Sequence, residues 1–277
     1  TMSECLALIT GSTGFLGQKF LIALLKAENC KYGDIILVGR ENNCVSAYGG
    51  KTFNIKDLPT KKIHLFHFAT LYNPRPKNFD EIDLIVKSNI MFPLEVMKAI
   101  PGVTDVYCIQ SYQELLPIYL QNEYSLSKRL FTNSLKSCGI RTCEFYLFDN
   151  FGINDKREKV VDKFIDNALA GQDLNIPIND VRINLCVASN IIENILNLID
   201  SEGDKYFIGN KETISLSELA QFIISETNSC SNVKSDGRIP DTLKYVEGEI
   251  TNITDYDNEA LYGDLVEHIH IKKTASL

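Results

Sequence analysis

A tyrosine and a lysine stand four residues apart within residues 123–128, and this pair could move a proton. Good helix formers flank it, so the side chains of Tyr124 and Lys128 should fall on one face of a helix. A phenol has a pKa of about 10, which makes it a poor proton donor and a scarce base at neutral pH. A fixed ammonium beside it favours the phenolate and lowers the pKa of Tyr124. The pair is therefore a candidate for acid–base catalysis, although the same spacing also occurs in ordinary exposed helices.

A glycine-rich turn near the N-terminus could bind phosphate groups. Residues 5–10 form a short apolar run typical of a buried strand, and residues 15–26 carry helical periodicity. Between and within them, Gly11 would permit a tight turn, Gly14 would let the backbone approach a pyrophosphate, and Gly17 would let helix and strand pack closely. The helix N-terminus would add amide donors and a partial positive charge. The order of strand, turn and helix predicts a dinucleotide site, and the alternative is a glycine turn that binds nothing.

The next predicted strand, residues 34–38, ends at Gly39 and Arg40. In sites that prefer NAD, an acidic residue about 20 positions beyond the glycine motif holds the ribose 2'-hydroxyl. A guanidinium at that place suits a 2'-phosphate instead. Arg40 therefore favours NADPH over NADH, unless it is only a solvated loop charge.

Further strands are expected at residues 51–55, 63–69, 106–110 and 142–147. Too few residues separate the first two for a crossover helix, which needs about ten or more. This part of the sheet should therefore be trimmed. Strands that alternate with helical segments predict an α/β fold around a parallel sheet.

Composition narrows the function classes. The 277 residues carry 28 basic and 36 acidic side chains, for a net charge of -8, and the basic residues are scattered, so nucleic acid is not an expected partner. No apolar run approaches the roughly 20 residues of a membrane span, and we expect a cytoplasmic protein without a signal peptide or membrane contact. The eight cysteines contain no Cys-x-x-Cys pair and are expected to be reduced thiols. His64 and His67 have no cysteine or carboxylate cluster beside them, so no metal site is expected.

The ordered motifs resemble those of the extended short-chain dehydrogenase/reductase family, which contains nucleotide-sugar epimerases, dehydratases and reductases. They are the glycine segment 10–17, the strand end 67–70, Asn89 in a helix, and Tyr124-x-x-x-Lys128. The resemblance implies a Rossmann-type, doubly wound parallel sheet with a small C-terminal substrate-binding subdomain. It also implies a homodimer through two helices that flank the sheet.

The resemblance divides the chain between two tasks. Residues 1–150, with parts of 180–210, would form the NADP-binding domain, and residues 151–277 would mostly bind the substrate. Lys128 would hydrogen-bond the nicotinamide ribose, Ala69 would lie at the same ribose, and the adenine would lie at the end of the third strand. The residues expected to contact the cofactor are Gly11, Thr13, Gly14, Phe15, Leu16, Gly17, Arg40, Asn54, Ile55, Ala69 and Lys128.

A serine or threonine at the end of the fifth strand completes the catalytic set in this family. Ser111 follows residues 106–110, and its hydroxyl could bond the reacting sugar oxygen and share its proton with the tyrosine. The alternative is a strand-terminal serine that makes a turn. Tyr112 and Gln113 stand where the related dehydratases carry Asp-Glu, and Glu114 comes one position late. Elimination of water is therefore not expected.

Residues 148–159 resemble the family segment Phe-Asn-x-Tyr-Gly-Pro, with Asp149 at the asparagine position. This variant looks most like the short reductases that act on NDP-4-keto-6-deoxyhexoses, such as the CDP-paratose and CDP-abequose synthases. An arginine after residue 180 would hold the nucleotide diphosphate through its bidentate guanidinium. The residues expected to contact the substrate are Asp149, Asn150, Lys159, Val160 and Arg182, and the alternative is a loop with surface charges.

The implied function is NADPH-dependent reduction of the C4 keto group of a nucleotide-linked 4-keto-6-deoxyhexose, a step of deoxysugar synthesis for surface lipopolysaccharide. Two alternatives stay open. One is an epimerase that uses Ser111, Tyr124 and Lys128 with a retained NAD, and the other is a degenerate NADP-binding sensor or scaffold. The sequence does not identify the nucleotide base, the stereochemistry at C4 or a role for residues 228–277, where His268 and His270 are expected at a solvated edge.

Overall fold

The computed structural model describes residues 5–28, 30–39, 43–48, 50–58, 62–238 and 254–275. The chain forms two compact units. The first unit comprises Thr1–Tyr146 and Ile195–Tyr206, and the second comprises Leu147–Asn194 and Phe207–Leu277. That the first unit binds the cofactor and the second binds the substrate stays a prediction.

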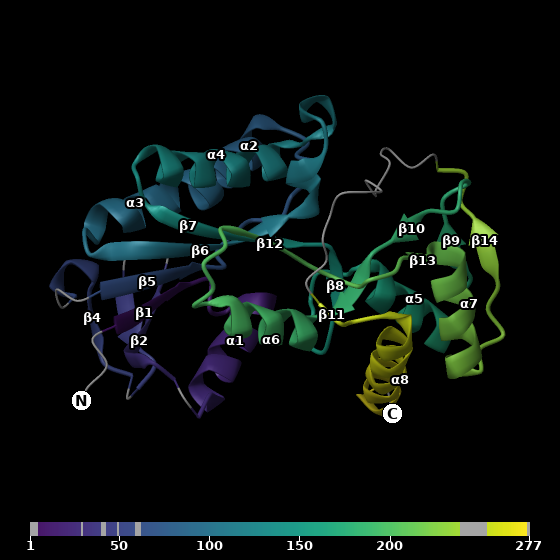
Figure 1. Ribbon diagram of the computed structural model, residues 1–277. Helices are drawn as coiled ribbons and strands as arrows, with labels where there is room; N and C mark the ends of the chain where they lie inside the picture. The colour runs from purple at the N-terminus through teal and green to yellow at the C-terminus, as the bar shows by residue number, and fades with distance from the viewer. Residues whose placement is uncertain are drawn as a thin grey trace. The chain divides into compact units, whose positions relative to one another are not determined.

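An eight-stranded sheet organises the first unit (Figure 1), with the strand order β12-β7-β6-β5-β1-β2-β3-β4. β1 runs parallel to both of its neighbours, β2 and β5, and β5 runs parallel to β6. The strands are β1 (Cys5–Thr10), β2 (Tyr32–Val38), β3 (Asn43–Ser46), β4 (Thr52–Asn54), β5 (Lys62–His67), β6 (Val103–Ser111), β7 (Arg141–Leu147) and β12 (Lys205–Ile208). Helices cover both faces of the sheet, with α2, α3 and α4 on one face and α1 on the other. The predicted Rossmann-type α/β fold is confirmed.

The helices of the first unit follow the apolar periodicity of the sequence. They are α1 (Phe15–Lys26), α2 (Phe79–Val86), α3 (Phe92–Ala99) and α4 (Glu123–Ser137), with the π-turn η2 (Lys87–Met91) between α2 and α3 and the 3₁₀ turns η1 (Ile55–Asp57), η3 (Tyr112–Leu115) and η4 (Ile118–Leu120). α6 (Ala188–Leu198) contributes residues to both units. None of the helices in the described ranges is long and apolar enough to cross a bilayer.

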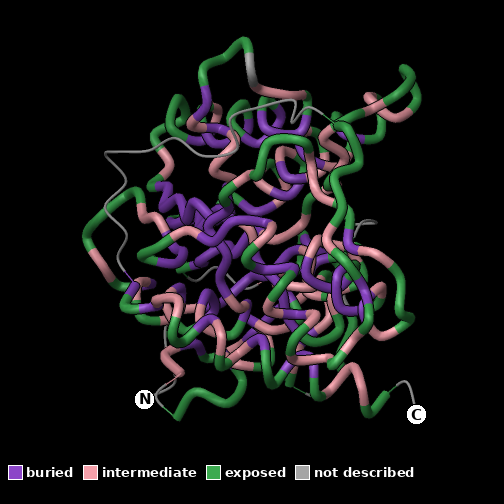
Figure 2. The backbone as a smooth tube through the Cα atoms, turned by 90° about the vertical axis from the view of Figure 1, so that its right-hand side faces the viewer, coloured by how far each residue is buried: buried purple, intermediate pink, exposed green. Residues whose placement is uncertain are grey.

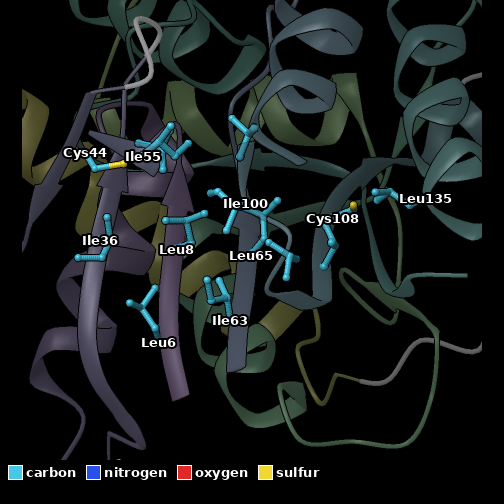
Figure 3. Close-up of a cluster of buried hydrophobic side chains, with 14 of the residues drawn as sticks. Leu6, Leu8, Ile36, Cys44, Ile55, Ile63, Leu65, Ile100, Cys108 and Leu135 are labelled. Atoms are coloured by element: carbon cyan, nitrogen blue, oxygen red, sulfur yellow. The ribbon is translucent and has the colours of Figure 1, made fainter. Parts of the chain in front are cut away.

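The core of the first unit lies against the central strands. Leu8 of β1 and Leu65 of β5 have no exposed surface, and Ile36 of β2 is only 1% exposed. Figure 3 shows these side chains in one cluster with Ile55 and Cys108. All residues of β1 except Cys5, and all residues of β5 except Lys62, are buried, and Figure 2 colours buried backbone purple. Parallel strands covered by helices have no face left for water. Strands of this kind read as continuous apolar runs, which is why residues 5–10 were recognisable.

β3 was not predicted from the sequence. It pairs antiparallel with β2 on one side and with β4 on the other. β3 thus occupies a stretch in which a longer chain would place a crossover helix between parallel strands. The sheet is trimmed here, as predicted, but β4 is displaced by one strand from β2.

Among its described residues, the second unit contains small sheets, the helices α5, α7 and α8, and the first part of α6. β8 (Asp149–Phe151) pairs with β11 (Leu185–Val187), β9 (Leu174–Ile176) with β14 (Val233–Ser235), and β10 (Arg182–Ile183) with β13 (Ile214–Ser215). α5 (Val160–Leu169) and α8 (Asn258–Ala275) both pack against α7 (Leu216–Thr227). A capping box of Ser215 and Glu218 opens α7, as the sequence pattern Ser-Leu-Ser-Glu predicts.

The prediction that His268 lies at a solvated edge is wrong, because this residue lies on the inner face of the helix α8. Its side chain is buried, and its Nε2 lies 3.0 Å from Oδ1 of Asp162 on α5. Lys272, one turn later on α8, places its ammonium 3.0 Å from the same carboxylate oxygen. His270 points to solvent. The buried carboxylate of Asp162 therefore joins α5 to α8.

Candidate functional site

In the turn after β1, backbone segments lie so close together that there is no room for a side chain between them. Gly11 has φ 70°, in the left-handed region that favours glycine. A Cβ on Gly11 would lie 2.4 Å from the main-chain N of Ala69, and a Cβ on Gly17 would lie 2.1 Å from the carbonyl oxygen of Gly11. Gly14 precedes α1 and provides no side-chain cap for its first amides. The turn therefore presents main-chain donors at a helix N-terminus, where an anion is stabilised.

Replacing Gly17 with alanine should destabilise the first unit by roughly 1 to 3 kcal/mol, because the new methyl group meets backbone that must shift. Urea unfolding measures this loss. Gly263→Ala in α8 is the matched control, since its Cβ would meet nothing within 4 Å and alanine favours a helix by about 0.5–1 kcal/mol. An unchanged unfolding midpoint for Gly17→Ala would contradict the close approach.

A cavity of about 880 Å³ opens at this turn. Its walls come from residues 11–14 after β1, residues 37–39 at the end of β2, and residues 68–71 after β5, with Val45 of β3 and one face of residues 87–95. The cavity thus lies outside the carboxyl ends of three parallel strands, where β1 has its neighbours on both sides and ligands bind in doubly wound sheets. Its volume, the close turn and the uncapped helix start all fit a dinucleotide cofactor.

The structure brings together part of the predicted cofactor site. Gly11, Thr13, Gly14 and Ala69 line the cavity. Phe15, Leu16 and Gly17 occupy the first turn of α1 and are not among the lining residues. Arg40 lies outside the described residues, so the preference for NADPH stays a prediction.

Asn54 and Ile55, predicted at the adenine, lie away from the cavity lining. Ile55 is 2% exposed within the hydrophobic core, and the Asn54 side chain caps η1 by accepting from the amide of Lys56 at 3.0 Å. Because β3 stands between β2 and β4, Val45 of β3 takes a place in the cavity wall. Sequence analysis missed Val45, since its strand was not recognised.

Tyr124 and Lys128 lie on one face of α4, as their spacing predicted. Nζ of Lys128 is 5.6 Å from the centroid of the Tyr124 ring, and both side chains are buried. The ring of Tyr72 packs edge-on against Tyr124, with 5.0 Å between centroids. Burial lowers the pKa of Lys128, while the neighbouring carboxylate of Glu114 opposes that shift. The helix start is fixed by Asn122, whose side chain accepts from the amide of Ser125.

Ser111 ends β6 and begins the turn η3. Its hydroxyl accepts from the amide of Gln113 at 3.3 Å, and its own amide donates to Oε1 of Glu114 at 2.8 Å. Ser111 therefore does form a turn, as the alternative reading of the sequence has it, but this role does not exclude a role in catalysis. Among the described residues, none accepts the proton of the Ser111 hydroxyl, so that proton can be donated to a ligand oxygen.

Asn89 joins the cavity wall to the helix that carries the tyrosine. It lies 2% exposed in the π-turn η2, and its Oδ1 accepts from the amide of Leu71 at 2.7 Å. Its Nδ2 donates to the carbonyl of Leu71 and to Oγ of Ser127, at 3.2 and 3.0 Å. Since Leu71 lines the cavity and Ser127 precedes Lys128, one buried amide holds α4 in place beside the cavity. A π-turn of this kind often marks a functional site.

The predicted substrate residues fall into two groups within the second unit. Asp149 and Asn150 lie on β8, while Lys159 and Val160 stand at the start of α5. Burial lowers the pKa of Lys159, and the nearby Asp149 opposes the shift. Arg157, which the sequence analysis did not select, joins this group.

Arg157 and Arg182 each face a carboxylate as well as a neutral partner. Nε and Nη2 of Arg157 donate to Asp155 at 2.7 and 2.6 Å, and Nη1 of Arg182 lies 3.3 Å from Oε2 of Glu218. Nη2 of Arg157 donates to Oδ1 of Asn150 at 2.7 Å. Arg182, on β10, is exposed and donates to the side chain and carbonyl of Thr213 at 2.8 and 2.7 Å. Among the described residues, no hydrogen bond or ion pair joins Arg182 to the start of α5, so the diphosphate role of Arg182 stays a prediction.

The sequence of the chain matches a known protein family and a known enzyme. A family model described as "NAD dependent epimerase/dehydratase family" matches residues 7–209. CDP-abequose synthase from Yersinia pseudotuberculosis is 24% identical over 247 residues, which cover 79% of this chain and 80% of that protein.

Two solved structures share the fold. One is UDP-glucuronic acid 4-epimerase from Bacillus cereus in complex with UDP-glucuronic acid and NAD, with a TM-score of 0.75, 15% identity, and coverage of 98% of this chain and 99% of that one. The other is UDP-N-acetylglucosamine 4-epimerase from Methanobrevibacter ruminantium M1 in complex with UDP-N-acetylmuramic acid, with a TM-score of 0.75, 18% identity, and coverage of 97% and 98%.

Proposed function

Because the chain belongs to the NAD dependent epimerase/dehydratase family, we propose that it is an NADPH-dependent reductase of the C4 keto group of a nucleotide-linked 4-keto-6-deoxyhexose. One observation carries the proposal. The buried pair of Tyr124 and Lys128 is tied through Asn89 to the wall of a cavity of dinucleotide size. The choice of sugar is supported by the likeness to CDP-abequose synthase and by the Asp149 segment.

The first unit would hold the cofactor. Main-chain amides of the turn at Gly11, Thr13 and Gly14 would bind the pyrophosphate, while Ala69 and Lys128 would lie at the nicotinamide ribose. The bound cofactor would supply a hydride to C4 of the sugar.

Tyr124 would complete the reduction by giving the proton of its phenol to the alkoxide that forms at the C4 oxygen. The ammonium of Lys128 would stabilise the phenolate that remains, and its charge acts strongly because both side chains are buried. The hydroxyl of Ser111 would donate a hydrogen bond to the same sugar oxygen. The product is a 4-hydroxy sugar, and solvent returns the proton to Tyr124.

The second unit would hold the sugar nucleotide. Lys159 and Arg157, the latter paired with Asp155, would lie near the start of α5, where the helix N-terminus also favours a diphosphate. Asn150 and Val160 flank this group and would contact the nucleotide, and Asp149 would contact the sugar. Arg182 would add a second guanidinium for the diphosphate.

Oxidation of NADPH, followed by the absorbance of the reduced nicotinamide, tests the proposal directly. CDP- and dTDP-4-keto-6-deoxyglucose are assayed in parallel, with NADH as the control cofactor. We expect rapid loss of absorbance with one of the two substrates and a clear preference for NADPH, which would also identify the nucleotide base. Silence with both substrates, in protein that still binds NADPH, would overturn the proposal. It would favour an epimerase if NAD co-purifies with the protein, and a sensor or scaffold if it does not.

A 4-epimerase is the second candidate, supported by the solved structures that share this fold. Ser111, Tyr124 and Lys128 could serve it equally, because epimerisation removes a hydride from C4 and returns it to the other face of the keto sugar. An epimerase retains NAD during purification and interconverts two sugars without net use of NADPH. Mass spectrometry of the cofactor in the purified protein distinguishes the two.

A further inference from the structure

Glu114 is a buried carboxyl group that the proposed chemistry leaves without a task. Its side chain, in η3, is 5% exposed. Oε1 accepts from the amide of Ser111 at 2.8 Å, whereas Oε2 is buried and receives a hydrogen bond from no described residue. A buried carboxylate oxygen without a donor is costly, so the position calls for a physical reason.

The turn itself aims this carboxyl inward. η3 is a 3₁₀ helix, in which consecutive residues are rotated by about a third of a turn. Gln113 therefore faces differently, and its Oε1 accepts from Nδ2 of Asn122 at the start of α4. Gln121 donates to the carbonyls of Glu114 and Leu116 at 3.0 and 2.6 Å and holds the turn from its other side. The turn thus holds the carboxyl group of Glu114 inside the protein.

Charged groups face Glu114 from two further elements. Burial raises the pKa of Glu114 to about 7, and the ammonium of Lys128 and the amide of Ser111 oppose the shift. Glu144 on β7 is already bonded by Lys136 and by the hydroxyl of Tyr146. Glu114 interacts electrostatically with five titratable groups. They are Lys128 and Arg129 on α4, Glu144 and Tyr146 on β7, and Cys108 on β6. Among the groups that lower the pKa of Glu114, Lys128 has the largest effect, and its side chain is also buried.

We propose that Glu114 is a positioning residue for the reaction inferred above: Oε1 holds the backbone of Ser111, and the buried carboxylate supplies a negative charge that acts on the ammonium of Lys128. Ser111 and Lys128 belong to different elements, β6 and α4, so a single carboxyl couples the two. This inference rests on the proposed function for its catalytic meaning. Its structural content, the effect of Glu114 on Ser111 and on Lys128, stands apart from any substrate.

The effect of Glu114 on Lys128 depends on pH. Above its pKa, ionised Glu114 raises the pKa of Lys128 and so favours the ammonium beside Tyr124. Below it, protonated Glu114 no longer opposes the lowering of the Lys128 pKa by burial. Turnover should therefore show an inflection near pH 7 that is absent when residue 114 cannot ionise.

Two substitutions separate the two roles. Glu114→Gln removes the charge but keeps an oxygen that can accept from Ser111, and Glu114→Leu removes both at similar volume. In the full chain with isotope-labelled lysine, NMR follows the titration of Lys128, whose resonance is identified by its loss in Lys128→Met. We expect the midpoint to fall by about one pH unit in both variants. An unchanged midpoint in Glu114→Gln would overturn the charge role.

Hydrogen exchange at the Ser111 amide tests the other role. Exchange should stay near the wild-type rate in Glu114→Gln and rise roughly tenfold in Glu114→Leu, since only the second change removes the acceptor. Equal exchange in all three proteins would overturn the positioning role.

Kinetics then connect the two roles to the reaction. The glutamine variant should lose roughly tenfold in kcat with little change in KM, and its pH profile should lose the inflection near pH 7. If Lys128 and Ser111 respond as expected while no sugar nucleotide is reduced by any of the proteins, the proposed function fails and the linkage through Glu114 stands. If reduction proceeds and both residues are unmoved, the function stands and the linkage fails.

Discussion

Tyr124→Phe should lower turnover by roughly two to four orders of magnitude while leaving the affinity for NADPH nearly unchanged. The substitution removes one hydroxyl and keeps the ring, so the packing against Tyr72 and the ammonium of Lys128 is retained. What is lost is the proton for the developing alkoxide, which water in a buried site replaces poorly. Single-turnover oxidation of NADPH measures the chemical step, and nicotinamide fluorescence measures binding.

A second buried tyrosine provides the matched control. The hydroxyl of Tyr107 on β6 donates to the carbonyl of Ile199, away from the cavity, and Tyr107→Phe removes it in the same way. This control should lose about 1 kcal/mol of stability and keep its turnover within a few fold. Wild-type turnover in Tyr124→Phe, or an equal loss in both variants, would refute the role given to the Tyr124 hydroxyl.

Mild acid should weaken the first unit through two buried histidines on β5. Burial lowers the pKa of His64 to about 4 and that of His67 to about 3. Both folded values lie below the ordinary value of 6.5, so the unfolded chain takes up protons that the folded chain excludes. The stabilisation is present above about pH 6.5 and is lost as the pH falls towards 4 and 3. At about 1.36 kcal/mol per pH unit, each histidine costs about 2 kcal/mol at about pH 5.

Glu114 works in the opposite sense, because its raised pKa means that acidification below about 7 relieves a buried charge. The test is therefore a comparison of variants. His67→Asn removes the titrating ring and can still bond the hydroxyl of Thr10, which lies 2.8 Å from Nδ1 of His67. Urea unfolding at neutral pH and at about pH 5 should show a loss smaller by about 2 kcal/mol in the variant than in the wild type. Equal losses would assign the acid sensitivity to other groups.

The features that were predicted from the sequence and are present in the structure have local causes. The demand for glycine at residues 11 and 17 follows from a strand that turns directly into a helix, and both close approaches are present. The common face of Tyr124 and Lys128 follows from the period of a helix. β3 escaped notice because residues 43–46 contain only two apolar side chains, and their extended form depends on pairing with both neighbours.

The contacts that were not predicted join residues far apart in the chain. Asn89 bonds Ser127, 38 residues away, and His268 bonds Asp162, 106 residues away. Neither partnership leaves a periodic signal in the sequence. The burial of Glu114 was equally hidden, because a glutamate next to a strand end reads as solvated until the turn that aims it inward is known.

The antiparallel course of β3 also bears on how the sheet is assembled. Val38 of β2 pairs with Cys44 of β3, six positions later in the sequence. Cys5 of β1, in contrast, pairs with Lys62 of β5, and all of α1, β2, β3 and β4 lie between them in the sequence. Pairs that are close in sequence form faster because less loop entropy is lost. β2, β3 and β4 can therefore form early and give the slower parallel pairs a template. The sheet also ends, among its described strands, in the three residues of β4, which leave little open edge to which another chain could add.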